Sequence, residues 1–81
     1  MANHILFFAG MMQFTGVTTV QWDDVAGLTI AEIRKRIRQK WPDAANLLSN
    51  CRLAINEQYV EDDAIVPIGA VVAVIPPVSG G

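Results

Sequence analysis

Two short apolar runs, one near each end of the chain, constrain the fold of this sequence most strongly. The first lies within His4–Ala9 and the second is Val71–Ile75. Neither run alternates between apolar and polar residues, so each is typical of a strand that is covered on both faces. We therefore predict that both strands lie at the centre of one sheet and that, if they are adjacent, they are parallel.

One amphipathic helix is predicted between these two strands. Thr29 and Glu32 have the spacing of a capping box, which marks the start of a helix, and Pro42 ends the helix after Trp41. Apolar residues at spacings of three, four and four form a single stripe, which consists of Ile30, Ile33, Ile37 and Trp41. The stripe indicates that the helix packs on one face of the sheet.

The remaining segments complete the pattern. We predict strands at Val17–Trp22, at Arg52–Asn56 with Leu53 and Ile55 inward, and at Tyr59–Val60. Gly10–Gly16 is a loop or a short helical turn, and Pro42–Asn50 contains a further helical turn held by Leu47 and Leu48. The order predicts an α+β protein with the β-grasp fold, the ubiquitin architecture, which has a mixed sheet and one main helix. Residues 1–76 form the domain and residues 77–81 an extended C-terminal tail.

Composition excludes several classes of function. The 81 residues suffice for one domain, and the single cysteine and single histidine allow neither a disulfide framework nor a cysteine-rich zinc site. Five basic residues lie between Thr29 and Trp41, but a pI near 5.0 argues against nucleic acid as a partner. We predict that the isolated chain is not an enzyme and binds no metal or cofactor.

The apolar runs also exclude a membrane partner. Ile5–Met12 and Ile68–Val78 are too short for a spanning helix, which needs about 20 residues. No Lys or Arg precedes the first run, as a signal peptide would require, and the single thiol is compatible with a reducing compartment. A cytoplasmic location is therefore predicted.

The C-terminal residues are the most informative for function. Gly80 and Gly81 can enter a slot too narrow for other residues, and Pro76 and Pro77 cannot continue a sheet and hold the chain extended. Such an arm delivers the α-carboxylate of Gly81 to a partner. A partner that uses ATP could convert this carboxylate to an acyl-adenylate, which a sulfur atom or an amine could then attack.

This terminus resembles that of a known family. Ile75–Gly81 is similar to the C-terminal signature of the small, sulfur-carrier subunit of molybdopterin synthase, and Ile5–Ala9 and Ala54–Glu57 resemble two further segments of it. The resemblance implies that an ATP-dependent adenylyltransferase activates Gly81, which becomes a thiocarboxylate (1-thioglycine). It also implies that the arm enters the large catalytic subunit, usually in a heterotetramer, and gives its sulfur to a cyclic pyranopterin monophosphate. The arm residues are Pro76, Pro77, Val78, Ser79 and Gly80.

Three alternatives remain open. A sulfur carrier of the thiazole pathway also ends in Gly-Gly, although Pro-Pro-Val-Ser before it favours molybdopterin. A ubiquitin-like protein modifier often has a basic residue near the diglycine, and this tail has none. The third alternative is a β-grasp binding module with a passive tail. The chain also departs from the family at Val66–Val71, where an acidic turn is common, although Asp62 and Asp63 lie a few residues earlier.

Other side chains are weaker candidates. Cys51 is predicted to be buried rather than a reactive thiol, and His4 to be structural or solvated. The three residues Trp22, Trp41 and Tyr59 are candidate interface anchors, with core packing favoured for Trp41. A partner-facing apolar patch is predicted from Phe7, Met11 and Met12.

Overall fold

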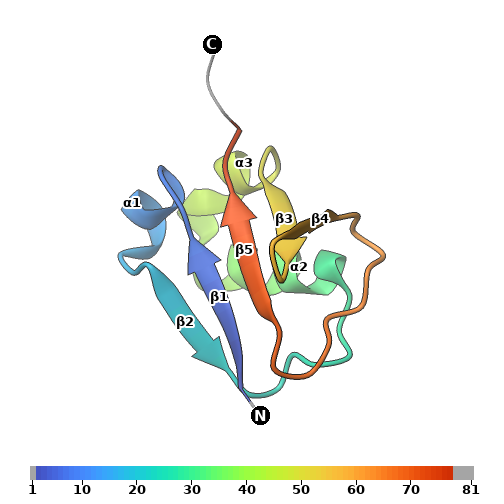
Figure 1. The fold of residues 1–81 in the computed structure, drawn as a ribbon. Coiled ribbons are helices and arrows are strands. Elements are labelled where there is room, and N and C mark those ends of the chain that lie inside the picture. The colour runs from blue at the N-terminus through green and yellow to red at the C-terminus, as the bar shows by residue number, and fades with distance from the viewer. Residues whose placement is uncertain (1, 78–81) are drawn as a thin grey trace.

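The elements follow the predicted order in a computed structural model, which describes residues 2–77. The helices and strands, shown in Figure 1, are β1 (Asn3–Phe7), α1 (Met11–Thr15), β2 (Thr19–Trp22), α2 (Ile30–Lys40), the 3-10 helix η1 (Pro42–Ala44), α3 (Ala45–Leu48), β3 (Arg52–Ile55), β4 (Gln58–Val60) and β5 (Val71–Ile75). The ambiguous segment between Gly10 and Gly16 is thus a short helix. The predictions for Val78, Ser79, Gly80 and Gly81 lie outside the described residues.

The five strands form one mixed sheet in the order β2-β1-β5-β3-β4. β1 and β5 are parallel neighbours, with Ile5 opposite Val72 and Phe7 opposite Val74, and the other pairs are antiparallel. The prediction that both strands lie inside the sheet is therefore confirmed, and as neighbours they are parallel, as expected (Figure 1). The sheet and its helices have the predicted α+β, β-grasp architecture.

The core lies between α2 and one face of the sheet. Ile30, Ile33 and Ile37 are completely buried there, and full burial of each stabilises the fold by roughly 1.5–3 kcal/mol. Trp41 extends the stripe with its ring edge-on to Phe7, the centroids 5.2 Å apart. The helix begins as predicted, because the Thr29 hydroxyl accepts a hydrogen bond from the Glu32 amide, and Glu32 accepts one from the Thr29 amide.

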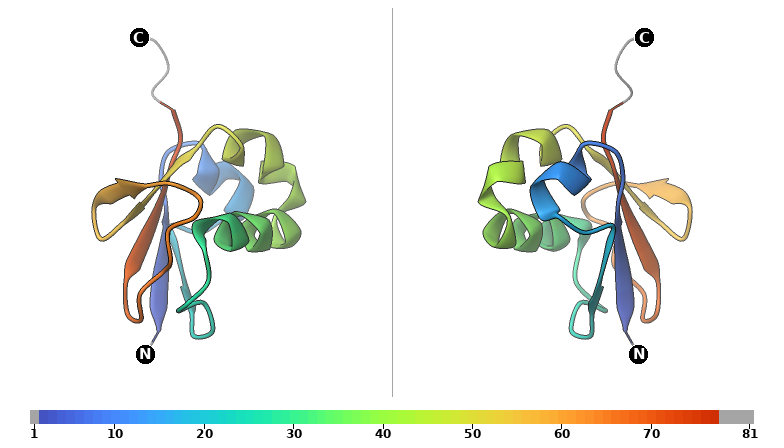
Figure 2. Two further views of the ribbon diagram at one scale, coloured as in Figure 1. Left: turned by 90° about the vertical axis from the view of Figure 1, so that its right-hand side faces the viewer. Right: turned by 90° about the vertical axis from the view of Figure 1, so that its left-hand side faces the viewer.

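Within residues 2–77, no helix covers the second face of the sheet, contrary to prediction. The helices of residues 2–77 all lie on one side of the sheet, as both views in Figure 2 show. Alternate residues of the central strands therefore face outward: Leu6 and Ile75 are only half-buried, and Phe8, just after β1, is 46% exposed. One main helix and three short ones, of which η1 is a 3-10 helix, cover a single face of the five-stranded sheet.

The predicted apolar patch is also partly wrong. Phe7 and Met11 are core residues, because Phe7 points to the helix side of the sheet and Met11 lies on the inner side of α1. Met12 is exposed, together with Phe14 and Val17. No helix within residues 2–77 has the length and hydrophobicity required to cross a membrane.

Candidate functional site

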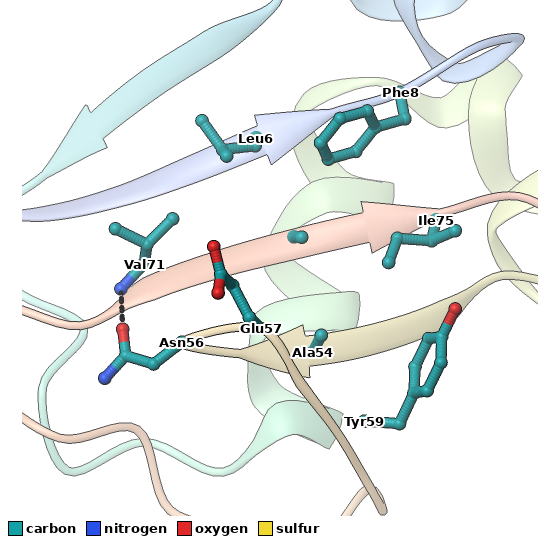
Figure 3. Close-up of a pocket in the computed structure, with 9 residues that line it drawn as sticks. Leu6, Phe8, Ala54, Asn56, Glu57, Tyr59, Val71 and Ile75 are labelled. Atoms are coloured by element: carbon teal, nitrogen blue, oxygen red, sulfur yellow. Dashed lines mark hydrogen bonds between the residues drawn. The ribbon is translucent and has the colours of Figure 1, made fainter.

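Small side chains hollow out the middle of the uncovered face. The register aligns one row of side chains across all five strands, and this row consists of Thr19, Leu6, Ala73, Ala54 and Tyr59. The two alanines lie side by side between Leu6 and Tyr59 in this row, so the face is lower there than at its larger neighbours. The result is a hollow of about 590 Å³ (Figure 3).

The walls of this hollow are mainly apolar. Leu6 and Phe8 form one side and Ile75 the end nearest the C-terminal residues, and Tyr59 lies across the floor from Leu6 (Figure 3). Phe8 and Tyr59 are 46% and 55% exposed, although buried aromatic rings stabilise proteins strongly. A contiguous apolar surface with exposed aromatic residues is typical of a protein–protein interface.

A tight turn closes the hollow at the end away from the C-terminal residues. Asn56 and Glu57, with φ angles of 48° and 72°, join β3 to β4. The Asn56 amide donates to the Val71 carbonyl over 2.8 Å, and the Asn56 Oδ1 accepts from the Val71 amide over 2.9 Å. Asn56 thereby fixes the turn to the start of β5, and the Glu57 side chain leans over the hollow (Figure 3).

A stacked cation lies on the same face near the other end of the hollow. The Arg52 guanidinium carbon is 4.0 Å from the centroid of the Tyr59 ring, in cation–π contact. Arg52 pairs with Ile75 in the register, so it lies beside the last residue of β5. The two charged groups, Glu57 and Arg52, are therefore found toward opposite ends of an apolar surface.

The C-terminal segment leaves the sheet directly from this surface. Ile75 lines the hollow and ends β5, and Pro76 and Pro77 follow without further strand pairing. Proline has no amide hydrogen to donate to a sheet, which explains why the strand ends here. The predicted arm thus starts from a central strand, beside the hollow, although the roles of its residues stay predictions.

The weaker candidates divide between core and surface. Cys51 is buried, and burial raises the pKa of its thiol, so the structure favours the packing role. His4 is exposed, as predicted for a solvated residue. Trp22 is half-buried beneath the Arg36 guanidinium, 5.2 Å from the ring centroid, and Trp41 packs on the core. Tyr59 is the one of the three aromatic candidates that lines the hollow.

The loop before β5 is organised by an apolar interior and one buried amide. The Asn3 side chain is completely buried, and its Nδ2 donates to the carbonyls of Pro67 and Ala70 over 2.8 and 3.0 Å.

Asp62, which lies near the position of the missing acidic turn, pairs with Arg34 at 3.0 Å. Asp62 is therefore already paired with a basic residue of its own chain.

The lining of the hollow is mainly apolar. Among the described residues that line it, Glu57 is the only charged one. Within residues 2–77, no three histidine, cysteine or acidic side chains come together as a metal site would require. The sequence interpretation missed the alanine floor and Glu57, although the outward-facing positions of Ala54 and Ala73 could have indicated a hollow once the pairing was known.

The mixed sheet, the single long helix and the central last strand define a ubiquitin-like β-grasp protein. Solved structures of this class superpose over nearly the whole chain. A putative molybdopterin converting factor subunit 1 from Pyrococcus furiosus matches with a TM-score of 0.84 and 22% identity, covering 95% of this chain and 98% of that one. The small archaeal modifier protein 1 of Haloferax volcanii matches with a TM-score of 0.82 and 16% identity, covering 95% and 98%. At these identities the likeness shows the fold.

Sequence comparison identifies the family. The ThiS family model matches residues 5–81, and the chain belongs to this family. A molybdopterin synthase sulfur carrier subunit of Arabidopsis thaliana is 35% identical over 77 residues, which cover 95% of this chain and 80% of that protein. The human protein of the same name is 30% identical over 80 residues, covering 95% and 91%. The resemblance first noticed in the C-terminal sequence is thus confirmed across the chain.

Proposed function

We propose that this chain is the sulfur-carrier subunit of a molybdopterin synthase, working in the cytoplasm. The observation that carries the proposal is the course of β5, a central strand that passes the apolar hollow and leads into Pro76, Pro77 and the diglycine end of the sequence. β5 therefore connects the hollow, which we propose as the docking surface, to the C-terminal residues that end in the Gly81 carboxylate. The names of relatives that match 95% of the chain support the same function.

The chemistry assigned to Gly81 follows from the reactivity of a carboxylate. An oxygen of its carboxylate attacks the α-phosphorus of ATP on the activating adenylyltransferase, and pyrophosphate leaves. Hydrosulfide, or a donor that delivers sulfur at the same oxidation level, then attacks the carbonyl carbon and displaces AMP, which leaves a thiocarboxylate. In the large subunit this sulfur attacks the cyclic pyranopterin monophosphate, and water hydrolyses the resulting thioester, so that the sulfur stays on the pterin and Gly81 returns to a carboxylate. The chain itself supplies the carrier group and its delivery, and we expect no turnover from the isolated chain.

The hollow is proposed as the surface that docks the large subunit. A partner side chain that fills the space above Ala54 and Ala73 would bury the exposed faces of Phe8 and Tyr59. The existence of such a partner is supported by the structural likeness to a protein solved in complex with its second subunit, the molybdopterin-converting factor of Helicobacter pylori, with a TM-score of 0.71 and 21% identity over both whole chains. The choice of the hollow rests on its apolar lining and on its exposed aromatic residues. We expect the assembly here to contain two copies of each subunit.

A second candidate function is protein modification. The structural likeness to the small archaeal modifier protein 1 favours it, because that fold and a diglycine end would equally suit an isopeptide bond to lysine. A thiazole-pathway carrier would use the same activated glycine. The two carrier functions differ only in the molecule that accepts the sulfur, so an assay that distinguishes them must include that acceptor.

Intact-mass analysis after co-expression with the activating enzyme distinguishes these functions. A carrier gains the mass difference between one sulfur and one oxygen atom, whereas a modifier is found on lysines of other proteins. The thiocarboxylated chain is then mixed with a molybdopterin synthase large subunit and the pterin precursor. Sulfur transfer confirms the proposal. An unmodified mass despite an active adenylyltransferase and a supplied sulfur donor such as sulfide would refute both carrier functions.

A further inference from the structure

The turn between β3 and β4 contains a glutamate where the backbone favours glycine. Both residues of this two-residue turn have positive φ angles, 48° at Asn56 and 72° at Glu57, which is the geometry of a type I′ turn. Asparagine tolerates this region, and glycine is the preferred second residue. A side chain at Glu57 therefore strains the backbone, and strained positions of this kind cluster at functional sites.

No contact within the described chain accounts for the choice of glutamate. The Glu57 side chain is exposed and forms neither a hydrogen bond nor an ion pair with any residue among 2–77. Asn56 alone ties the turn to β5. The carboxylate instead leans over the floor of the hollow, toward Leu6 (Figure 3).

Docking at the hollow would change the surroundings of this carboxylate. A partner that covers Ala54 and Ala73 also removes water from Glu57, and a carboxylate that loses water without a partner charge is strongly destabilised. A cationic side chain in the docked surface removes this penalty, and in the drier interface the attraction is stronger than in water. An apolar or acidic group at the same point is rejected.

We propose that Glu57 is a specificity residue of the docking surface, which pairs with a lysine or arginine of the large subunit. The inference rests on the proposed function, since it takes that subunit as the partner. Arg52, held against Tyr59 beside Ile75, presents the opposite charge toward the other end of the hollow. An apolar surface alone admits several orientations, whereas two separated charges of opposite sign admit one. That orientation sets where the C-terminal residues enter the partner.

The test compares two substitutions at the strained position. Glu57→Gly removes both the charge and the strain, and Glu57→Gln removes the charge and keeps a side chain at positive φ. Asp43→Asn is the matched control, because Asp43 is exposed in η1 on the helix side of the sheet and its loss changes the net charge equally. Affinity for the purified large subunit is measured by calorimetry at low and high salt, and stability by thermal melting.

In Glu57→Gly, thermal stability and affinity for the large subunit are expected to change in opposite directions. Glu57→Gly should raise the melting temperature by about 2–6 °C, as release of a strained turn predicts for a domain of this size. Both Glu57 variants should bind the large subunit about 3- to 10-fold more weakly at low salt, and this difference should shrink at high salt. Asp43→Asn should bind as the unchanged chain does.

Three results would overturn the inference. If both Glu57 variants bind as tightly as the unchanged chain, the carboxylate has no partner charge, while the carrier function stands on thiocarboxylate formation and wild-type binding. If only Glu57→Gly loses affinity, the turn backbone is responsible rather than the charge. If the unchanged chain does not bind the large subunit at all, the proposed function fails, and the inference fails with it.

Discussion

Filling the hollow should separate docking from folding. Ala73 is half-buried on the open face of β5, between Leu6 and Ala54. In Ala73→Leu the new side chain extends into the hollow and away from the core, so the free energy of unfolding should change by less than about 0.5 kcal/mol. A partner side chain of Leu or Phe size could then no longer enter the hollow, and the complex would lose the roughly 1.5–3 kcal/mol of binding free energy that its burial provides. The affinity for the large subunit should therefore fall about 10- to 150-fold.

The control adds the same side chain to the same face outside the hollow. Gln21 is exposed on the edge strand β2 and pairs with His4, and it does not line the hollow. Calorimetric titration of Gln21→Leu into the large subunit should give the affinity of the unchanged chain. Equal affinity for Ala73→Leu would show that the partner does not pack on the alanine floor, and equal losses in both variants would show a general effect of surface leucine.

Three further outcomes are expected. One residue appended after Gly81 displaces the carboxylate by about 3.3–3.6 Å, so thiocarboxylate formation, measured by intact mass, should stop. Gly80→Val should have the same effect. Full activation of the extended chain without trimming would contradict the carrier function. Thr29→Ala should lower the free energy of unfolding by about 1 kcal/mol in urea titrations. The Thr29 amide and hydroxyl lower the pKa of Glu32, so the stability from this carboxylate should be present above the unfolded-state pKa of about 4.3 and lost as pH falls through the lowered folded value. A stability difference between Glu32→Ala and wild type that does not shrink in acid would refute this. Cys51 should react with iodoacetamide at pH 8 only slowly until the chain is denatured, because burial raises its pKa, and rapid native labelling would contradict that.

Much of the fold could be predicted because local and long-range signals agree. The capping box at Thr29 and the isoleucine stripe place α2, and the apolar composition of Val71–Ile75 places β5 inside the sheet. These signals depend on short spacings or on composition, which are directly visible in a sequence. The register across strands is not visible in this way, because it depends on which residues of separate segments become opposite.

Two adjacent residues show the limit of such reasoning. Phe7 is buried and Phe8 is 46% exposed, although both belong to one apolar run. The pairing of Phe7 with Val74 turns Phe7 toward α2, and the alternation of a strand then turns Phe8 to the other side. The same pairing brings Ala54 next to Ala73 and so creates the hollow. The φ angle of Glu57 is equally a property of the completed hairpin.

The prediction that the sheet is covered on both faces was wrong for a physical reason, and that reason supports the proposed docking. An apolar run shows that both sides of a strand favour exclusion of water, but it does not show which molecule excludes it. Here α2 covers Val72 and Val74, while Ala73 and Ile75 remain available for a partner. Ile75 is also the last residue before Pro76 and Pro77, so a partner that packs on this strand contacts the point from which the C-terminal residues depart. Since catalytic placement tolerates errors of only about 0.5 Å, a strand shared by the proposed docking surface and the proposed carrier arm would be a more accurate guide than a tail attached elsewhere.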